Sequence, residues 1–161
     1  MPQISDLFKF GPFELHQRLD ALSLSYGDSQ AWQSSLTTES REEIKTAVYT
    51  QLLQHFEHSD VVSQILGHFH IHQSLDAYLD TLLTQELEEG YIEGLAQHIL
   101  GIAKYEEVHE YYSIVSHVLH RCIIDNLASR CRSLENFRSL ELRLQLDLSI
   151  LLQFLHTKSM E

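Results

Sequence analysis

The chain has few prolines, glycines and cysteines, and the scarcity of each excludes certain fold classes or motifs. Only two prolines and six glycines interrupt its 161 residues. Folds built from many short strands need both residues at their turns, whereas long helices do better without them. The two cysteines, Cys122 and Cys131, form no CxxC pair, so the pattern favours neither a disulfide scaffold nor a redox motif. We therefore predict an all-α protein of a reducing, cytoplasmic compartment.

Positive charge is scarce as well. The chain holds 11 Lys and Arg against 23 Asp and Glu, which gives a formal net charge of -12. Such a surface repels phosphate backbones and anionic membranes, so we expect no nucleic-acid partner. The amino terminus lacks a basic start followed by an apolar run, and no stretch of about 18 apolar residues occurs. We expect neither export nor membrane insertion.

The acidic excess is confined to the first three quarters of the chain. Residues 1–120 carry 5 basic and 18 acidic residues, a net of -13, whereas residues 121–161 carry 6 and 5, a net of +1. A nearly neutral surface is suited to pairing with another helix surface. The last helices are therefore the expected site of self-association.

Apolar spacing predicts a series of helices of unequal length within one domain, residues 1–161. We expect an amino-terminal arm over residues 1–12 and a helical core over residues 13–158. A helix beginning near Thr37 or Thr38 has an acidic first turn and an apolar stripe, the pattern of a capped amphipathic helix. Later helices carry their apolar residues at helical spacing; these are Leu75, Tyr78, Leu79, Leu82 and Leu83, and then Leu140, Leu144, Leu148, Leu151 and Leu155.

Three segments together resemble the bacterial sensor globins, the ligand-detecting domains known as globin-coupled sensors. They are EEIKTAVYTQLLQHF, the run from Ile65 to Ile92, and the closing ELRLQLDLSILLQFL. The resemblance covers residues 37–156. It implies a globin-like fold of seven to eight helices, whose last two helices pair with those of a second chain as a four-helix bundle. It also implies that Asp147, inside the closing leucine-rich run, helps to build that dimer.

The same resemblance implies a haem pocket, but the chain departs from the family at the iron ligand. Tyr49 falls where the family keeps a distal tyrosine, and Leu75 and Leu79 correspond to apolar pocket positions. Ungapped counting puts Ile102 where the family has its haem-ligating histidine, and the nearest histidine on that face is His98, one turn earlier. Two branches stay open: haem b bound through His98 as the iron ligand, or a domain without haem.

Other histidine groups suggest metal binding or pH sensing. His68 and His72 would share a helical face, and His109, His117, His120 and Cys122 form a candidate zinc set. The angular spacing of His120 and Cys122 on one helix does not close a tetrahedral site by itself. The 11 histidines could also act as a pH sensor. We prefer a solvated loop start for His68 and His72, and a merely histidine-rich composition over a pH sensor. A zinc-dependent sensor built on His109, His117, His120 and Cys122 stays a third hypothesis.

The expected function is regulatory and not catalytic. No nucleophile elbow, phosphate-binding glycine loop or HExxH motif occurs in the chain. The resemblance implies an input domain of a larger bacterial signalling protein, such as a diguanylate cyclase, a chemotaxis transducer or a stress regulator. Its output domain would be covalently linked, and its signal, oxygen or another gas if haem binds, would pass through the homodimer. The alternatives are a haem-free globin-like sensor and a helical protein-interaction module.

Overall fold

Helices make up nearly all of the chain that the computed structural model describes, which is residues 17, 18, 20–22, 30–34, 36–67, 69–84, 91, 95, 106–131 and 133–159. No strand occurs among these residues, so the all-α expectation is confirmed. The helices are α3 (Gln30–Gln33), α4 (Thr38–His55), α5 (Asp60–Leu66), α6 (Phe69–Thr84), α8 (Glu106–Leu127) and α9 (Leu134–Ser159), with a 3-10 turn at Ala128–Arg130 between the last two.

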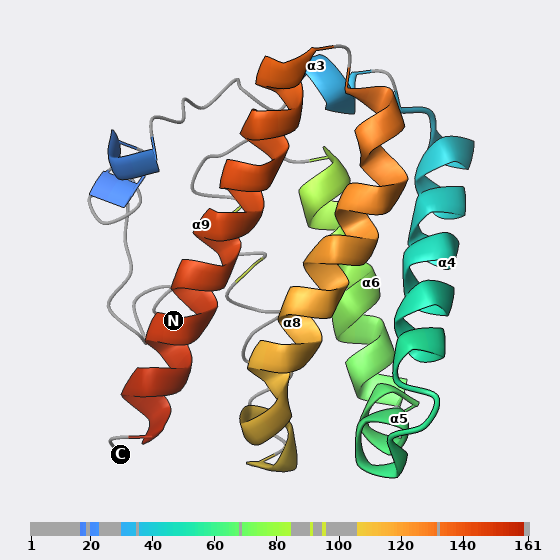
Figure 1. The fold of residues 1–161 in the computed structure, drawn as a ribbon, viewed down its shortest axis with the longest axis vertical. Coiled ribbons are helices and arrows are strands. Elements are labelled where there is room, and N and C mark those ends of the chain that lie inside the picture. The colour runs from blue at the N-terminus through green and yellow to red at the C-terminus, as the bar shows by residue number, and fades with distance from the viewer. Residues whose placement is uncertain are drawn as a thin grey trace, which may run out of the picture.

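The long helices run roughly alongside one another in two layers. In Figure 1, α8 and α9 lie next to each other at the front, α4 flanks α8, and α6 passes behind them. Helix α4 packs against both α8 and α6, α8 packs against α9, and α5 packs against α6. The short α3 lies at the end of the bundle where α8 is joined to α9, and Gln33 Nε2 donates to the Leu82 carbonyl at 2.8 Å.

Side-chain caps explain where two of the helices begin. The Thr37 hydroxyl accepts from the Ser40 backbone N–H at 3.0 Å and so caps α4, as its position before an acidic turn predicts. The Ser59 hydroxyl accepts from the Val62 N–H in the same way at the start of α5. Helix α5 ends at Gly67. The predicted cap near Thr37 or Thr38 is thus resolved in favour of Thr37.

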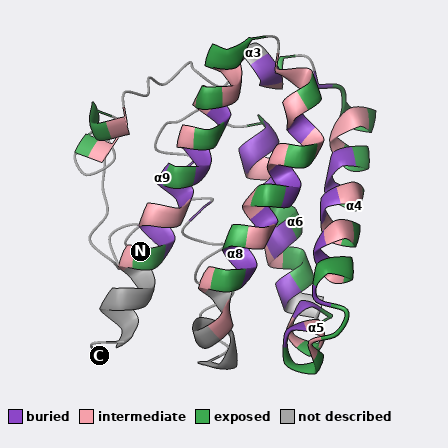
Figure 2. Cartoon of the chain, viewed as in Figure 1, coloured by how far each residue is buried: buried purple, intermediate pink, exposed green. Residues whose placement is uncertain are grey.

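A single apolar core runs between the two layers. Figure 2 shows its buried residues as stripes along the facing sides of α4, α6, α8 and α9. The stripe predicted on α6 is confirmed, because all five of its apolar residues are buried. On α9, Leu140, Leu144 and Leu151 are buried as predicted, Leu148 is half-buried, and Leu155 has no described side chain. Helical periodicity therefore predicts the α6 stripe in full and the α9 stripe in part.

Two further observations complete the fold. The start of the predicted helical core, from residue 13 on, lies mostly outside the described residues. Arg18 in this region reaches the closing helix, where its guanidinium donates to the Ser149 hydroxyl at 2.9 Å and also to Gln153 Oε1. Among the described residues, no helix combines the length and apolar character that a membrane-crossing segment needs.

Candidate functional site

The most unusual part of the interior is a polar cluster around the closing helix. We call it the Asp147 cluster; its members are Trp32, Tyr78, Tyr91, Arg143 and Asp147. All five side chains are buried, with exposed fractions of 0 to 2%. Burying an arginine and an aspartate this deeply is expensive unless other groups compensate for the lost water. The surrounding helices must therefore supply groups that stabilise these two buried charges.

Two phenol hydroxyls donate to the Asp147 carboxylate, one to each oxygen. Tyr78 of α6 donates to Oδ2, and Tyr91, a helical residue between α6 and α8, donates to Oδ1. The two donors are 69 and 56 residues away in sequence. A carboxylate can accept at both oxygens at once, so one side chain of α9 joins two other parts of the fold.

Arg143 lies one turn before Asp147 and is surrounded by aromatic rings. Its guanidinium carbon is 4.5 Å from the centre of the Tyr91 ring and 5.7 Å from that of Trp32. Such a cation over an aromatic face gains electrostatic attraction that strengthens when water is excluded. The positive charge also acts on the Asp147 carboxylate, so the two opposite charges of the cluster stabilise one another.

Burial governs the protonation of this cluster. It raises the pKa of Asp147 to about 6, although the Arg143 charge and the hydrogen bonds from Tyr78 and Tyr91 act in the opposite direction. Burial, followed by the Asp147 charge, also holds the pKa of Tyr91 well above its ordinary value. The phenol of Tyr91 therefore keeps its proton at neutral pH, while the carboxyl changes charge in a physiological range.

The sequence resemblance gave Asp147 a different role. It implied that this residue helps to build a dimer, yet its side chain is only 2% exposed within a single chain. The carboxyl faces the interior of its own domain, so it cannot contact a second chain from that position. The physical reason is the pair of phenol donors, which hold the carboxylate inside the fold.

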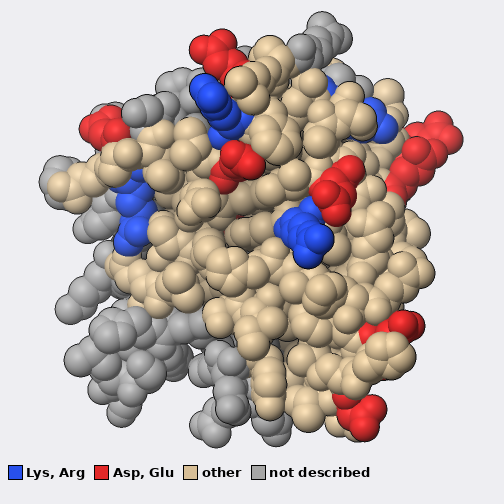
Figure 3. All heavy atoms as spheres, in the orientation of Figure 1, with Lys and Arg blue, Asp and Glu red and all other residues tan. Residues whose placement is uncertain are grey.

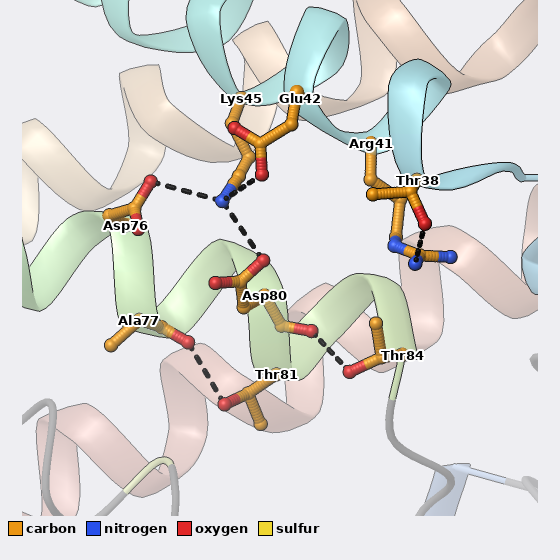
Figure 4. A network of polar contacts seen from close by, with 9 residues as sticks. All are labelled: Thr38, Arg41, Glu42, Lys45, Asp76, Ala77, Asp80, Thr81 and Thr84. Atoms are coloured by element: carbon orange, nitrogen blue, oxygen red, sulfur yellow. Dashed lines mark hydrogen bonds and ion pairs between the residues drawn. The ribbon is translucent and has the colours of Figure 1, made fainter.

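A second buried charge lies between α4 and α6. Lys45 Nζ is 3.0 Å from Glu42 Oε1 on its own helix, and 3.2 and 3.0 Å from Asp76 Oδ1 and Asp80 Oδ1 on α6. Figure 4 shows the ammonium enclosed by these three carboxylates. Burial alone lowers the pKa of Lys45, but the hydrogen bonds to the carboxylates outweigh it and the net pKa is raised. This lysine holds two helices together and stays charged.

The predicted distal residues all lie on described helices. The Tyr49 hydroxyl donates to the Leu66 carbonyl at the end of α5 at 2.8 Å, and its ring is 4.3 Å from that of His72. Leu75 and Leu79 of α6 are buried in the common core. A phenol has one proton to donate, so a distal role for Tyr49 would require that its bond to Leu66 be broken. The assignment of Tyr49, Leu75 and Leu79 to a pocket over haem stays a prediction.

The predicted iron ligand cannot be placed. His98 and Ile102 both lie outside the described residues, so the assignment of either to the proximal position stays a prediction. A haem group would need an axial ligand from this region.

The candidate zinc residues are only partly described. His117 of α8 is exposed, His120 is half-buried and Cys122 is buried, while His68 and the side chain of His109 are not described. Among the described residues, no three potential metal ligands share a site. Burial, with a smaller effect from His117, lowers the pKa of the half-buried His120 to about 4.

Comparison with known proteins adds no relative: no protein-family profile, curated protein or solved structure matches this chain. Functional inference therefore depends on the residues themselves. The Asp147 cluster was missed in the sequence because Tyr78 and Tyr91 fit ordinary apolar positions. The one signal that could have pointed to it was a pair of charges, Arg143 and Asp147, one turn apart within a leucine-rich helix.

Proposed function

We propose that this chain is a sensor-type regulatory domain of globin-like plan, which works without haem and pairs with a second copy through α8 and α9. The observation that carries the proposal is a row of exposed residues along each of these helices that includes large apolar side chains. Ile114 of α8 is 53% exposed, and Leu134 and Leu152 of α9 are 64% and 45% exposed. Where apolar side chains exposed to this degree lie together on neighbouring helices, they form a surface suited to an interaction.

Charge supports pairing at this surface. The exposed row on α8 includes Ile114, His117, Arg121 and Asp125, and the row on α9 includes Leu134, Arg138, Glu141, Gln145 and Leu152. Each row carries one basic and one acidic residue, in contrast to the acidic excess of residues 1–120. On the face seen in Figure 3, charged side chains form small separate spots within a largely uncharged surface. Two such surfaces can meet without strong repulsion.

The absence of haem from the proposal rests on two observations. Counting from Tyr91 to Tyr112 puts Ile102, which cannot ligate iron, at the ligand position. The hydroxyl of Tyr49 is engaged by the Leu66 carbonyl. We therefore prefer signalling through changes in helix packing to signalling through bound gas.

The route of the signal follows from the position of α9. Its buried side is joined to α6 and Tyr91 through Asp147, and its exposed side carries the proposed dimer surface. A change in the interior would therefore shift α9 and change the geometry of the dimer. In a longer protein, that change would pass to a linked output domain. Catalysis is not part of this role.

The dimer is tested by single substitutions that place a charge on the proposed surface. We expect the wild-type domain to sediment as a dimer, and we expect Ile114→Glu or Leu152→Glu to convert it to a folded monomer. Val61→Glu is the matched control, because Val61 is 47% exposed but lies on α5. A wild-type monomer at all concentrations would reject pairing and favour a helical module that binds a different protein.

The haem branch is tested by an absorption spectrum before and after adding haemin under reducing conditions. We expect no Soret band at stoichiometric haemin. An intense Soret band that disappears in His98→Ala would instead establish the haem-binding sensor, with Tyr49, Leu75 and Leu79 around the ligand.

A further inference from the structure

Asp147 is the only described carboxyl that is fully enclosed by its own domain. It is 2% exposed, lies on the closing helix, and accepts hydrogen bonds from Tyr78 of α6 and from Tyr91. The other acidic residues whose side chains the structure describes are half-buried or exposed. A carboxyl buried among groups from several elements is a position where one proton can change packing.

We propose that Asp147 is a proton-operated latch: gain or loss of one proton on its carboxyl changes its bonds to Tyr78 and Tyr91 and thereby how α9 packs against α6. The latch concerns the interior of a single chain. It requires neither the dimer nor a bound ligand, so it stands apart from the function proposed above.

The hydrogen bonds of Asp147 differ between its ionised and its protonated carboxyl, and these are the two states of the latch. The ionised carboxylate only accepts, and both phenols donate to it. When the carboxyl takes up a proton, one of its oxygens becomes a donor. That added proton needs an acceptor of its own: either the facing phenol accepts it and turns its own proton elsewhere, or the phenol keeps donating and the carboxyl proton needs a different partner. Since unsatisfied polar groups in an apolar core are costly, the tyrosine or the helix must move.

The charges of the cluster change at the same step. The ionised carboxylate balances the Arg143 guanidinium, which is wholly buried over Tyr91 and close to Trp32. Protonation removes that balancing charge and leaves the guanidinium as the dominant charge of the cluster. Arginine does not release its proton in proteins, so relief has to come from a shift of the side chain or of α9 itself.

Of the charged and titratable groups described around the cluster, we expect Asp147 to change its protonation near pH 6. The described groups that act on its pKa are Arg143, Tyr78 and Tyr91, and α3 contributes the neutral Trp32. On α4, Lys45 is paired instead with Glu42, Asp76 and Asp80. On α8, His117 is exposed, and the pKa of the half-buried His120 is lowered by burial to about 4. The pKa of about 6 for Asp147 therefore puts the expected change in protonation above the pKa of His120.

The chain contains its own reporter of the latch. Trp32 is its only tryptophan, it is wholly buried, and the Arg143 guanidinium lies 5.7 Å from its ring centre. Indole fluorescence depends on nearby charge and packing. We therefore expect the tryptophan emission of the folded wild-type domain to change between about pH 8 and about pH 4 with a midpoint near 6.

Three variants decide whether Asp147 causes that change. In Asp147→Asn, which cannot ionise, the transition should be lost. In Tyr91→Phe and Tyr78→Phe, the carboxylate loses one donor, so the midpoint should rise by about one pH unit. Tyr49→Phe is the matched control, because its hydroxyl donates to the Leu66 carbonyl and the midpoint should not move.

The proposal is overturned if wild-type emission does not change across this range. It is also overturned if the transition persists in a folded Asp147→Asn, since Asp147 would then not be the group that causes it. Should Asp147→Asn fail to fold, the two phenylalanine variants decide, because each removes a single oxygen and leaves the ring in place. An unchanged midpoint in both of them rejects the latch.

Discussion

At the scale of single residues, the domain buries charge in two different ways. Lys45 is neutralised by three carboxylates that remain half-exposed, so only the ammonium leaves water. Arg143 and Asp147 are both wholly enclosed and depend on aromatic rings and phenol hydroxyls. The sequence shows Lys45 beside Ile44 in an acidic helix start. That pattern is equally typical of a lysine whose charged end reaches solvent, so its burial could not be predicted.

Replacing Lys45 with methionine should destabilise the domain by about 1 to 3 kcal/mol, because three carboxylates would face one another without a cation. Urea unfolding monitored by circular dichroism measures the loss. Asp80→Asn in the Lys45→Met background should restore part of the stability. An unchanged or higher unfolding midpoint in Lys45→Met would show that the ammonium contributes nothing.

At the scale of helices, capping and periodicity were good predictors where a helix has one apolar side. Helix α4 begins at its predicted cap, and the α6 stripe is buried as expected. Periodicity predicted burial less well on α9, where the apolar stripe is wide. On α9, the leucines at 142 and 148 are half-buried, whereas Leu146 is wholly buried. Which leucines face the core depends on where α8 and α6 lie, and spacing alone does not contain that information.

The cap of α4 gives a test at this scale. Thr37→Ala should lower the free energy of unfolding by about 1 kcal/mol, because the Ser40 backbone N–H loses its side-chain acceptor. Thr38→Ala is the adjacent control: the exposed Thr38 hydroxyl accepts from the Arg41 guanidinium at 3.1 Å and does not cap a backbone N–H of the helix, so the effect should be smaller. Equal losses in the two variants would assign the cap to neither residue. Chemical denaturation compares them.

At the scale of the whole molecule, composition predicted the helical class, and charge distribution indicated which helices differ from the rest. The Asp147 cluster could not be predicted from the sequence. Tyr78, Tyr91 and Asp147 are distant along the chain, and nothing in their local patterns shows that they meet. The globin-like order of helices stays a proposal, since the segment expected to hold His98 and Ile102 lies outside the described residues.

Global stability should depend on pH through two opposing groups. Because the pKa of His120 is lowered from 6.5 to about 4, its contribution to stability is present above pH 6.5 and is lost as pH falls through 4. Because the pKa of Asp147 is raised from 3.8 to about 6, its contribution is present below pH 3.8 and is lost as pH rises through 6. Each is worth at most about 3 kcal/mol, so they largely cancel between pH 4 and 6.

Replacing His120 should reveal the pH dependence of stability that Asp147 causes. His120→Gln should become more stable as pH falls from about 6.5 to about 4, whereas the wild type should change much less. His58→Gln, at a side chain that is 93% exposed, should behave as the wild type does. Thermal unfolding across this range provides the comparison. A wild type and a His120→Gln variant with parallel curves would show that His120 does not carry a lowered pKa.

The position of Lys45 also has a consequence for its chemistry. An acylating reagent needs access to an uncharged amine, and Lys45 Nζ is enclosed between α4 and α6 by carboxylates that keep it protonated. The reagent can react only when the two helices separate and the ammonium meets water. The rate at which Lys45 is acylated in the folded domain therefore reports the fraction of molecules in which α4 and α6 are apart.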